Sequence, residues 1–360
     1  MREFRIAVFP GDGIGREVMA PCLTLLETVM SQTSEVCLRF EPHEAGAELY
    51  LKTGVALPED VLRAAASADA ILLGAMGHPD VRYPNGTEIV PQIDLRDRFQ
   101  LYAGIRPIRV FPGVRIPLGD PRATGIDFVI VRESTEGLFA ARTESRREGE
   151  DVVLDTMRVT RHGSERLFEA AFALARRRRR PDRATRVTCV DKANVLPSMA
   201  FFRRIFFDCA ARHPDIIADC LYVDAAALRL VRSPWDLDVL VTENMFGDIL
   251  SDLGAGLMGG MGMAPSADIG DTQAVFQPCH GTAPDIAGRG LANPTAMFLS
   301  GAMMLDWLGV RHSAPACQRA AGALTQAVER AFAGGRLVPV EHGGSAGTVE
   351  ITERVLKHLT

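Results

Sequence analysis

Two aspartates, Asp248 and Asp252, stand four residues apart in the segment 243-ENMFGDILSDLGAG-256. On a helix this spacing places both carboxylates on one face, where their like charges repel each other. A hard divalent cation with oxygen ligands would relieve this repulsion, and Mg²⁺ or Mn²⁺ is the natural candidate. A solvated helix face is the alternative interpretation. Asp224, which follows another apolar run, is a candidate for a third carboxylate.

Three arginines have the chemistry to bind carboxylates. Arg96 and Arg106 lie ten residues apart, and Pro107 favours an extended backbone at Arg106. Together with Arg132 they offer forked donors, each able to bind a carboxylate through two hydrogen bonds. The set predicts a small substrate with more than one carboxylate.

Lysine is rare in this chain. Of the 40 lysine and arginine residues, only Lys52, Lys192 and Lys357 are lysines. Burial and neighbouring groups can tune an ammonium group into a base, whereas a guanidinium cannot lose its proton at any useful pH. Lys192 follows a strand-like run and is therefore a candidate proton acceptor. The alternative is that it is a chance survivor of an arginine-rich composition.

The candidate residues follow short β-rich runs that alternate with helical patterns, which is typical of a largely parallel sheet with crossover helices. Ligands of such sheets collect beyond the carboxyl ends of the strands. Arg132, Lys192, Asp224 and Asn244 lie at such ends, so we expect them to converge on one cleft. The runs are residues 69–74, 127–133, 186–194, 220–224 and 237–244.

The segment 10-PGDGIGREVM-19 follows the apolar run 6-IAVF-9 and leads into a helical pattern that extends to residue 30. Its glycines, Gly11, Gly13 and Gly15, do not have the Gly-x-Gly-x-x-Gly spacing of a Rossmann phosphate-binding turn. A tight turn with close backbone approach is one interpretation, and a plain strand-to-helix turn is the other.

Length and charge restrict the class of protein. A chain of 360 residues is long for one compact core, which favours two closely joined α/β domains. A net charge of −5 argues against a dedicated nucleic-acid binder. The basic run of residues 176–180 follows the amphipathic stretch 164–175, so it is interpreted as the solvated end of a helix.

The seven cysteines form no C-x-x-C pair and are odd in number, which is typical of reduced residues in a cytosolic protein. The N-terminal residues do not form a secretory signal peptide. The uncharged stretch 253–267 is too short and too rich in glycine to span a bilayer. We therefore expect a soluble, cytoplasmic protein without membrane association.

Taken together, several segments resemble the β-decarboxylating dehydrogenases, a family that includes 3-isopropylmalate, isocitrate, homoisocitrate, tartrate and D-malate dehydrogenases. The resemblance implies an α/β isopropylmalate dehydrogenase-like fold with a shared, mostly parallel sheet, not a Rossmann fold. It implies a cofactor-binding domain of residues 1–100 plus 255–360, a substrate, metal and dimerisation domain of residues 101–254, and a homodimer whose cleft borrows residues from its partner. The segments are GDGIGREV, the LR and IRP pair, VRESTEGLF, VDKANVL, YVDAAAL, TENMFGDILSDLGAG and HGTAPDIAGRGLANP.

The same resemblance implies that the loop 280-HGTAPDIAGRGLANP-294 holds the dinucleotide, with GDGIG forming a wall of the cleft near the nicotinamide. An acidic Asp285 at the adenosine ribose would accept bonds from a free 2′-hydroxyl and repel a 2′-phosphate, so NAD is expected rather than NADP. The implied cofactor-binding residues are His280, Gly281, Thr282, Ala283, Asp285, Asn293, Gly13 and Ile14.

For the chemistry, the resemblance implies that Arg96, Arg106 and Arg132 orient the substrate carboxylates. Phe139 and Asn194 are further implied substrate-binding residues. The implied catalytic residues are Lys192 and Asp224, and the implied ligands of Mg²⁺ or Mn²⁺ are Asp248, Asp252 and the partner's Asp224. On this scheme Lys192 and Asp224 would reach one cleft from different chains.

The sequence departs from the family pattern at two positions, with Phe139 in place of a tyrosine and Gln277 in place of a common glutamate. The segment 85-NGTEIVPQIDLR-96 lacks the leucine-rich pattern of isopropylmalate enzymes and carries the polar residues Gln92 and Asp94. The leading hypothesis is NAD-dependent oxidative decarboxylation of a 3-substituted (2R)-malate, a small dicarboxylic 2-hydroxy acid, with 3-isopropylmalate as the favoured substrate. D-malate or tartrate as substrate, or a catalytically weak regulatory homologue, are the alternatives.

Overall fold

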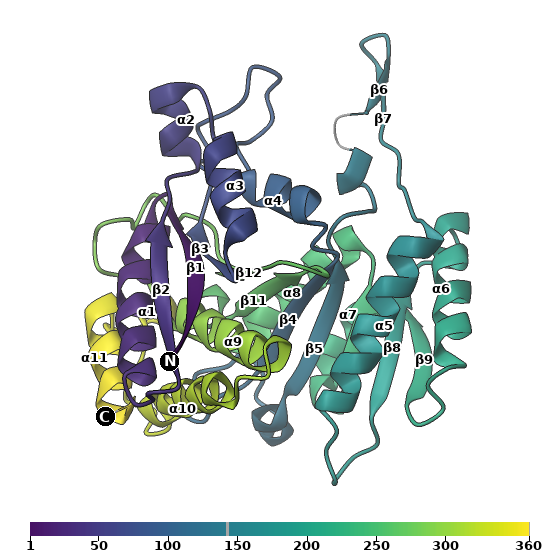
Figure 1. The fold of residues 1–360 in the computed structure, drawn as a ribbon. Coiled ribbons are helices and arrows are strands. Elements are labelled where there is room, and N and C mark those ends of the chain that lie inside the picture. Colours follow the sequence, from purple (N-terminus) through teal and green to yellow (C-terminus); the bar gives the residue numbers. More distant parts are fainter. Residues whose placement is uncertain (142–143, 360) are drawn as a thin grey trace.

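The computed structural model describes residues 1–141 and 144–359 of the chain. The chain folds around one ten-stranded sheet with helices on both faces (Figure 1). A separate two-stranded ribbon consists of β6 (Arg146–Glu148) and β7 (Val152–Leu154). The strands of the large sheet are β1 (Arg2–Gly11), β2 (Val36–Pro42), β3 (Ala70–Ala75), β4 (Ala103–Arg109), β5 (Asp127–Glu133), β8 (Arg186–Asp191), β9 (Ile217–Tyr222), β10 (Val239–Thr242), β11 (Pro265–Ile269) and β12 (Ala274–Pro278).

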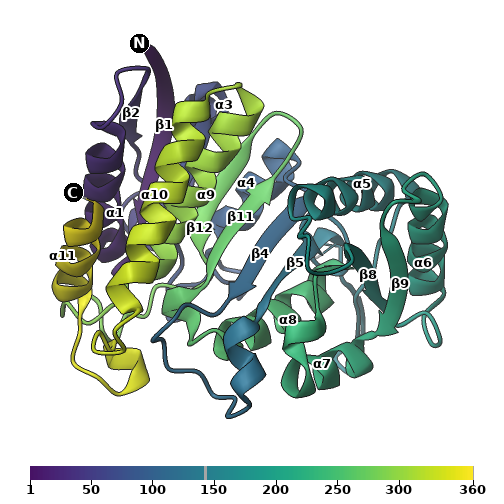
Figure 2. The ribbon, with the colours of Figure 1, turned by 90° about the horizontal axis from the view of Figure 1, so that it is seen from below.

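The helices connect these strands and cover both faces of the sheet (Figure 2). Most have one apolar face against the sheet, as expected for crossover helices in an α/β protein. They are α1 (Ile14–Met30), α2 (Ala47–Thr53), α3 (Glu59–Ser67), α4 (Pro91–Phe99), α5 (Arg161–Arg177), α6 (Pro197–Ala210), α7 (Val223–Arg232), α8 (Asn244–Leu257), α9 (Thr295–Arg311), α10 (Pro315–Phe332) and α11 (Thr348–Leu359).

The strand order across the sheet is β2-β1-β3-β12-β11-β4-β5-β10-β8-β9. Six of the neighbouring pairs are parallel, and three, around β4 and β11, are antiparallel. The predicted α/β fold with a mostly parallel sheet is therefore confirmed. The division into two domains at the predicted boundaries stays a prediction.

The inner strands are buried because helices cover them on both sides. Every residue of β3 and β10 is buried, whereas the edge strands β2 and β9 are mostly half-buried. Beside β5, β8 and β10, the aromatic rings of α5 and α6 pack together, with Phe168 and Phe202 centroids 4.6 Å apart. This packing makes the half of the sheet that carries β5, β10, β8 and β9 a rigid support.

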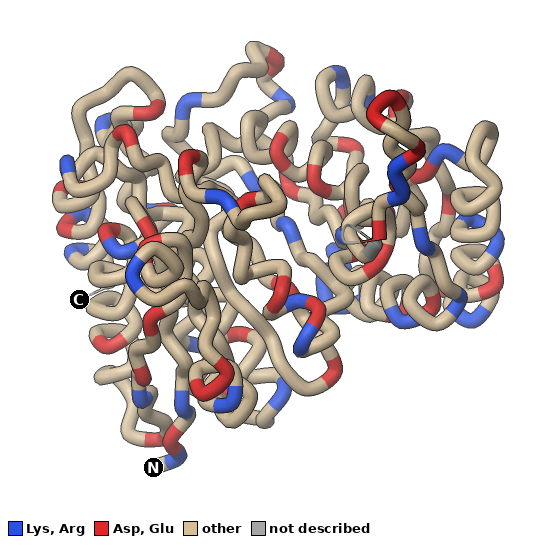
Figure 3. The backbone as a smooth tube through the Cα atoms, turned by 90° about the horizontal axis from the view of Figure 1, so that it is seen from above, with Lys and Arg blue, Asp and Glu red and all other residues tan. Residues whose placement is uncertain are grey.

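The basic run of residues 176–180 lies at the end of α5, as predicted, and Arg176, Arg177 and Arg179 are exposed. Each of its arginines pairs with an aspartate: Arg178 bonds Asp127 at 2.7 Å, and Arg176 bonds Asp215 at 2.7 Å. These pairs tie the end of α5 to the start of β5 and to the loop before β9. Figure 3 shows the same mixture of charges over the whole chain, with acidic and basic residues interspersed.

None of the helices in the described residues combines the length and the apolar composition that a membrane-spanning helix requires.

Candidate active site at the carboxyl ends of the parallel strands

The predicted residues gather at one edge of the sheet. Arg132 is the penultimate residue of β5, Asn244 begins α8 directly after β10, and Lys192 follows β8. Asp224 lies in the first turn of α7, because β9 ends at Tyr222, two residues earlier than predicted. Since β5, β10, β8 and β9 are neighbouring and parallel, their carboxyl ends meet at this edge.

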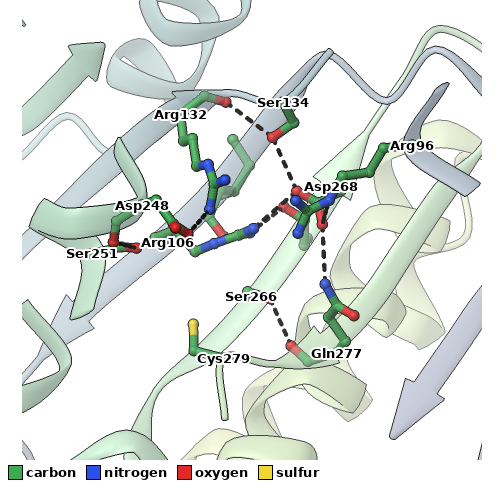
Figure 4. A network of polar contacts seen from close by, with 12 residues as sticks. Arg96, Arg106, Arg132, Ser134, Asp248, Ser251, Ser266, Asp268, Gln277 and Cys279 are labelled. Atoms are coloured by element: carbon green, nitrogen blue, oxygen red, sulfur yellow. Dashed lines mark hydrogen bonds and ion pairs between the residues drawn. The ribbon is translucent and has the colours of Figure 1, made fainter. Parts of the chain in front are cut away.

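The arginines Arg96, Arg106 and Arg132 come from α4, β4 and β5 and point toward one another (Figure 4). All three are buried, with 8%, 4% and 4% of their surface exposed. Burial, together with the charges of Arg96 and Arg106, lowers the pKa of Arg132 to about 10. Three guanidinium groups in one buried place therefore need anionic partners, which a substrate with several carboxylates would supply.

One carboxylate of the protein already lies among these arginines. Asp268 of β11 is fully buried and accepts hydrogen bonds from Arg96 Nε at 3.1 Å and Arg106 Nη2 at 3.0 Å (Figure 4). Ser134 and Gln277 also donate to it, both at 3.2 Å. Burial by itself would raise the pKa of Asp268, but the neighbouring arginines lower it to about 2. Asp268 therefore carries a permanent negative charge.

Helix α8 positions the two carboxylates that the sequence predicts as metal ligands. It begins at Asn244 because the Glu243 side chain accepts hydrogen bonds from the amides of Met245 and Phe246, at 3.1 and 2.6 Å. Asp248 and Asp252 follow one turn apart, and Asp248 contacts Arg132. Burial and repulsion from Asp248 raise the pKa of Asp252, as expected for two carboxylates that share a site.

Arg132 connects the arginines to this pair of carboxylates. Its Nη1 contacts Asp248, and its Nε and Nη2 donate to Asn244 Oδ1 at 3.0 and 2.8 Å. The Asn244 amide in turn donates to the carbonyl of Glu136 at 3.0 Å. Asn244 thus fixes the guanidinium at the point where the arginine cluster and the α8 carboxylates meet.

Lys192 and Asp224 form an ion pair within one chain, with 2.8 Å between Nζ and Oδ1. The hydrogen bond from Lys192 lowers the pKa of Asp224. The expectation that these two residues reach one cleft from different chains is therefore wrong, because a cleft that contains one contains the other. Among residues 1–141 and 144–359, no three histidine, cysteine or acidic side chains of one chain are placed to hold a metal ion. Asp224 accordingly does not join Asp248 and Asp252 within the chain.

A buried ion pair that the sequence analysis missed orients the turn at Lys192. Asp191 is fully buried and accepts two hydrogen bonds from Arg203 of α6, each 2.7 Å long. Its carboxylate also accepts the amide of Ala193 at 2.8 Å. Lys192 and the exposed Asn194 lie in this turn, directly after the carboxyl end of β8.

Phe139 lies next to the arginine cluster, with its ring 5.6 Å from the guanidinium carbon of Arg132. It stands in a short 3₁₀ turn, Phe139–Ala141, that follows β5. The predicted substrate-binding position is therefore close to the groups that would hold the substrate. Its ring has no hydroxyl to donate a proton.

The GDGIG turn and the predicted cofactor loop touch each other. The Ile14 amide donates to the carbonyl of Thr282 at 2.9 Å. Gly13 has a φ of 54°, and a Cβ atom there would lie 2.2 Å from the same carbonyl oxygen. The predicted close approach is therefore confirmed between two protein loops.

Glu17 of α1 anchors the predicted cofactor loop through hydrogen bonds. Its carboxylate accepts hydrogen bonds from the amides of Gly288 at 3.0 Å and Ala292 at 3.3 Å, and from the Thr348 hydroxyl at 2.6 Å. Glu17 belongs to the motif GDGIGREV, but no local pattern in the sequence indicates this role. The structure makes it the link between the GDGIG turn and the cofactor loop.

The loop offers polar groups suited to a dinucleotide. His280 Nε2 is buried and has no hydrogen-bond partner in the described part of the chain, and burial lowers the pKa of this histidine. Asp285 is exposed, and the space above Gly281 is open. Asn293 differs, because its side chain bonds Glu341 at 2.7 Å and Thr295, so it holds the loop together and has only its backbone to offer a ligand.

Comparison with known proteins shows the family to which the chain belongs. Residues 5–355 match the family model described as isocitrate/isopropylmalate dehydrogenase. The chain belongs to this family. It is therefore an oxidative β-decarboxylating dehydrogenase.

Individual members of the isocitrate/isopropylmalate dehydrogenase family align with almost the whole chain. A 3-isopropylmalate/3-methylmalate dehydrogenase of Methanocaldococcus jannaschii is 40% identical over 356 residues, 99% of this chain and 98% of the relative. An isocitrate/homoisocitrate dehydrogenase of Thermus thermophilus is 40% identical over 357 residues, again 99% and 98% of the two chains. The crystal structure of an isocitrate dehydrogenase from Methylococcus capsulatus superposes with a TM-score of 0.87 at 35% identity, covering 100% of this chain and 99% of that one.

The Glu17 brace in this family member can be tested directly. In Glu17→Gln one carboxylate oxygen becomes an amide donor that faces backbone N–H groups, so the loop loses a hydrogen bond to a charged group. We expect faster amide hydrogen exchange in residues 288–292, by about three- to tenfold. The control is Glu27→Gln, an exposed position on the same helix. Unchanged exchange in Glu17→Gln would contradict the bracing role.

Proposed function

We propose that the chain catalyses the NAD-dependent oxidative decarboxylation of a 3-substituted (2R)-malate, with 3-isopropylmalate as the favoured substrate, to give a 2-oxo acid, CO₂ and NADH. The observation that carries the proposal is the buried cluster of Arg96, Arg106 and Arg132 beside the carboxylates of α8. The arginines would hold the two carboxylates of the substrate and so fix the carbon that loses its hydride.

The α8 carboxylates fit a divalent cation, because two like charges on one helix face and the raised pKa of Asp252 call for a positive partner. Asp248, Asp252 and the partner's Asp224 would hold Mg²⁺ or Mn²⁺. Such a cation polarises a hydroxyl or carbonyl oxygen and stabilises the negative charge that develops there. Lys192, as the neutral amine, would accept the proton of the 2-hydroxyl, and its hydrogen bond to Asp224 keeps the nitrogen in place.

The cofactor loop supports NAD as the oxidant. Asp285 is exposed on the loop, where a carboxylate would accept the free 2′-hydroxyl of the adenosine ribose and repel a 2′-phosphate. His280, with its buried and unpartnered Nε2, would bond to the adenosine half. Gly13 and Ile14 lie against Thr282 and would close the nicotinamide end.

One observation favours a polar 3-substituent, as in tartrate. Gln92 and Arg96 stand four residues apart on α4 and therefore share a helix face. Gln92 Oε1 is buried and has no hydrogen-bond partner in the described part of the chain. A 3-hydroxyl group could donate to this oxygen, whereas an isopropyl group would leave it without a partner. Tartrate is therefore the second candidate substrate, ahead of D-malate.

A panel of 3-substituted malates, tartrate and D-malate tests the proposal, with NADH formation as the measurement. We expect turnover with NAD and Mn²⁺, none after chelation, and at least about a tenfold lower kcat/KM with NADP. The best substrate in the panel decides between an apolar and a polar 3-substituent. Full turnover in chelated buffer would overturn the cation site, and the absence of turnover with every substrate would favour a regulatory homologue.

Phe139 permits a test of the protonation step. Phenylalanine fills the space of a tyrosine but offers no proton, so the enolate left by decarboxylation must obtain its proton from a slower donor. General acid catalysis typically contributes ~10²- to 10⁴-fold, and we therefore expect Phe139→Tyr to raise kcat on the best substrate with little change in KM. The matched control is Phe207→Tyr, which adds a hydroxyl on the exposed side of α6.

Steady-state kinetics of these two variants decide the question. A level or lower kcat in Phe139→Tyr, with the control unchanged, would mean that an efficient proton donor exists elsewhere or that the substrate needs none.

The proposed enzyme is a homodimer with shared active sites. Apolar side chains of α7 and α8 are exposed beside the acidic residues: Leu228 is 59%, Val231 50% and Ile249 62% exposed. An apolar surface on two neighbouring helices is typical of a subunit interface. Packing of this surface against a second copy would bring the Lys192–Asp224 pair of one chain toward the α8 carboxylates of the other.

Mixing two inactive variants tests this arrangement. If Lys192 and Asp248 serve one site from different chains, a mixed dimer of Lys192→Met and Asp248→Asn subunits has one site with both lesions and one intact site. Random exchange should then restore about a quarter of wild-type activity. The control mixes Lys192→Met with Asp224→Asn and should restore no activity. Because Lys192 and Asp224 of one chain enter the same site, every site of a mixed dimer carries one of the two lesions. Verified exchange without recovery in the first mixture would refute the shared site.

A further inference from the structure

We propose that Asp268, together with Gln277, sets the charge of the substrate that the arginine cluster accepts. By cancelling one of the three positive charges of Arg96, Arg106 and Arg132, Asp268 favours a dicarboxylate over a tricarboxylate. This inference rests on the proposed function, because it takes the three arginines as the groups that bind substrate carboxylates.

Burial and hydrogen bonds to two arginines hold the carboxylate of Asp268 in one place within the arginine cluster. The side chain is 1% exposed, and its two oxygens bind different arginines, Oδ2 at Arg96 Nε and Oδ1 at Arg106 Nη2. The Asp248 side chain, by contrast, is 49% exposed and belongs to the pair proposed for the cation. Neither water nor an incoming substrate can replace Asp268 without breaking several hydrogen bonds.

Strands β4 and β11 leave room for the carboxylate of Asp268. In β11, Ser266 and Asp268 face the arginines, while the alternate residues Pro265, Ala267 and Ile269 line an apolar groove on the opposite face. Gly104 pairs with Asp268 across the strands, and a Cβ atom there would lie 3.0 Å from Asp268 Oδ1 and 2.6 Å from the Ser134 hydroxyl. A glycine therefore leaves the room that the carboxylate and its hydroxyl donor occupy.

Stability alone gives little reason for such a network. Removing two opposite charges from water costs free energy that their attraction often does not return, and apolar replacements of buried ion pairs are frequently neutral or stabilising. A buried Asp268 with two buried arginines is therefore better explained by the binding of an anion. The arginines attract the substrate, and the aspartate limits how much negative charge they attract.

Gln277 lies beside Asp268, so the negative charge can be moved from position 268 to position 277 by exchanging the two side-chain types. Its Nε2 donates to Asp268 Oδ2 at 3.2 Å, and both residues are buried on neighbouring strands. Exchanging the two chemical groups, in Asp268→Asn/Gln277→Glu, keeps one carboxylate, one amide and the hydrogen bond between them. Asp268→Asn alone removes the negative charge, and Gln277→Glu alone adds a second one.

The test measures binding of glutarate, a dicarboxylate, and tricarballylate, a tricarboxylate, to the full-length protein at low ionic strength and constant Mg²⁺. Both probes lack a 2-hydroxyl group, so titration calorimetry reports binding without turnover. We expect Asp268→Asn to shift the ratio of affinities toward tricarballylate by at least about tenfold, because a trianion gains more than a dianion from one additional positive charge. Gln277→Glu should shift the ratio the other way, and the double variant should return to within about twofold of the wild type.

The control Asp271→Asn removes the same charge at an exposed position in the β11–β12 turn and should leave the ratio unchanged. A purely structural role would weaken both probes equally in Asp268→Asn and leave the ratio constant, which would overturn the proposal. If Asp268→Asn does not fold, the other two variants still decide it, because Gln277→Glu should shift the ratio toward glutarate and the double variant should restore the wild-type ratio. A shifted ratio in a protein that oxidises no substituted malate would refute the proposed substrates but support the charge selection.

Discussion

The concentration of three guanidinium groups in one buried place is the constraint on which the rest of the site depends. Arg96, Arg106 and Arg132 are each less than a tenth exposed, so water cannot balance their charge. Asp268 and Asp248 balance it within the protein, and Asn244 holds Arg132 between them. The glycine at position 104 leaves room for Asp268 and for the Ser134 hydroxyl that donates to it.

The sheet separates this polar site from an apolar groove. Alternate residues of β4 and β11 face opposite ways, so Arg106 and Asp268 lie on one face while Ile105 and Ala267 line a groove of about 1110 Å³ on the other. The ion pair between Arg177 of α5 and Asp306 of α9, 2.6 Å long, spans the groove. Helix α5, which packs beside β5, β10 and β8, is thus linked to helix α9, which packs beside β11 and β12.

The site divides into fixed and accessible parts. The arginines and Asp268 are buried and held by several hydrogen bonds, which suits groups that must recognise charge with a constant geometry. The Lys192–Asp224 pair is more open, with the two side chains 27% and 69% exposed, and lies near the apolar surface of α7 and α8. The cofactor loop is intermediate, because Glu17 and Glu341 anchor it while Asp285 remains exposed. The buried arginine cluster is therefore combined in one chain with more exposed polar and apolar surfaces at the ends of the same sheet.

The sequence by itself determined the α/β class, the strands β3, β5, β8, β9 and β10, and the gathering of Arg132, Lys192 and Asn244 at one edge, because these follow from local periodicity and from the direction of parallel strands. It also indicated the close approach at Gly13. Only the tertiary structure decided that Lys192 pairs with Asp224 of its own chain and that Asp268 lies among the arginines. Asp268 stands 162 residues from Arg106 and 172 from Arg96 in the chain, and no local pattern records a contact at such separation. The balance of charge in a buried cluster is a property of packing, and it becomes visible only when the strands are placed side by side.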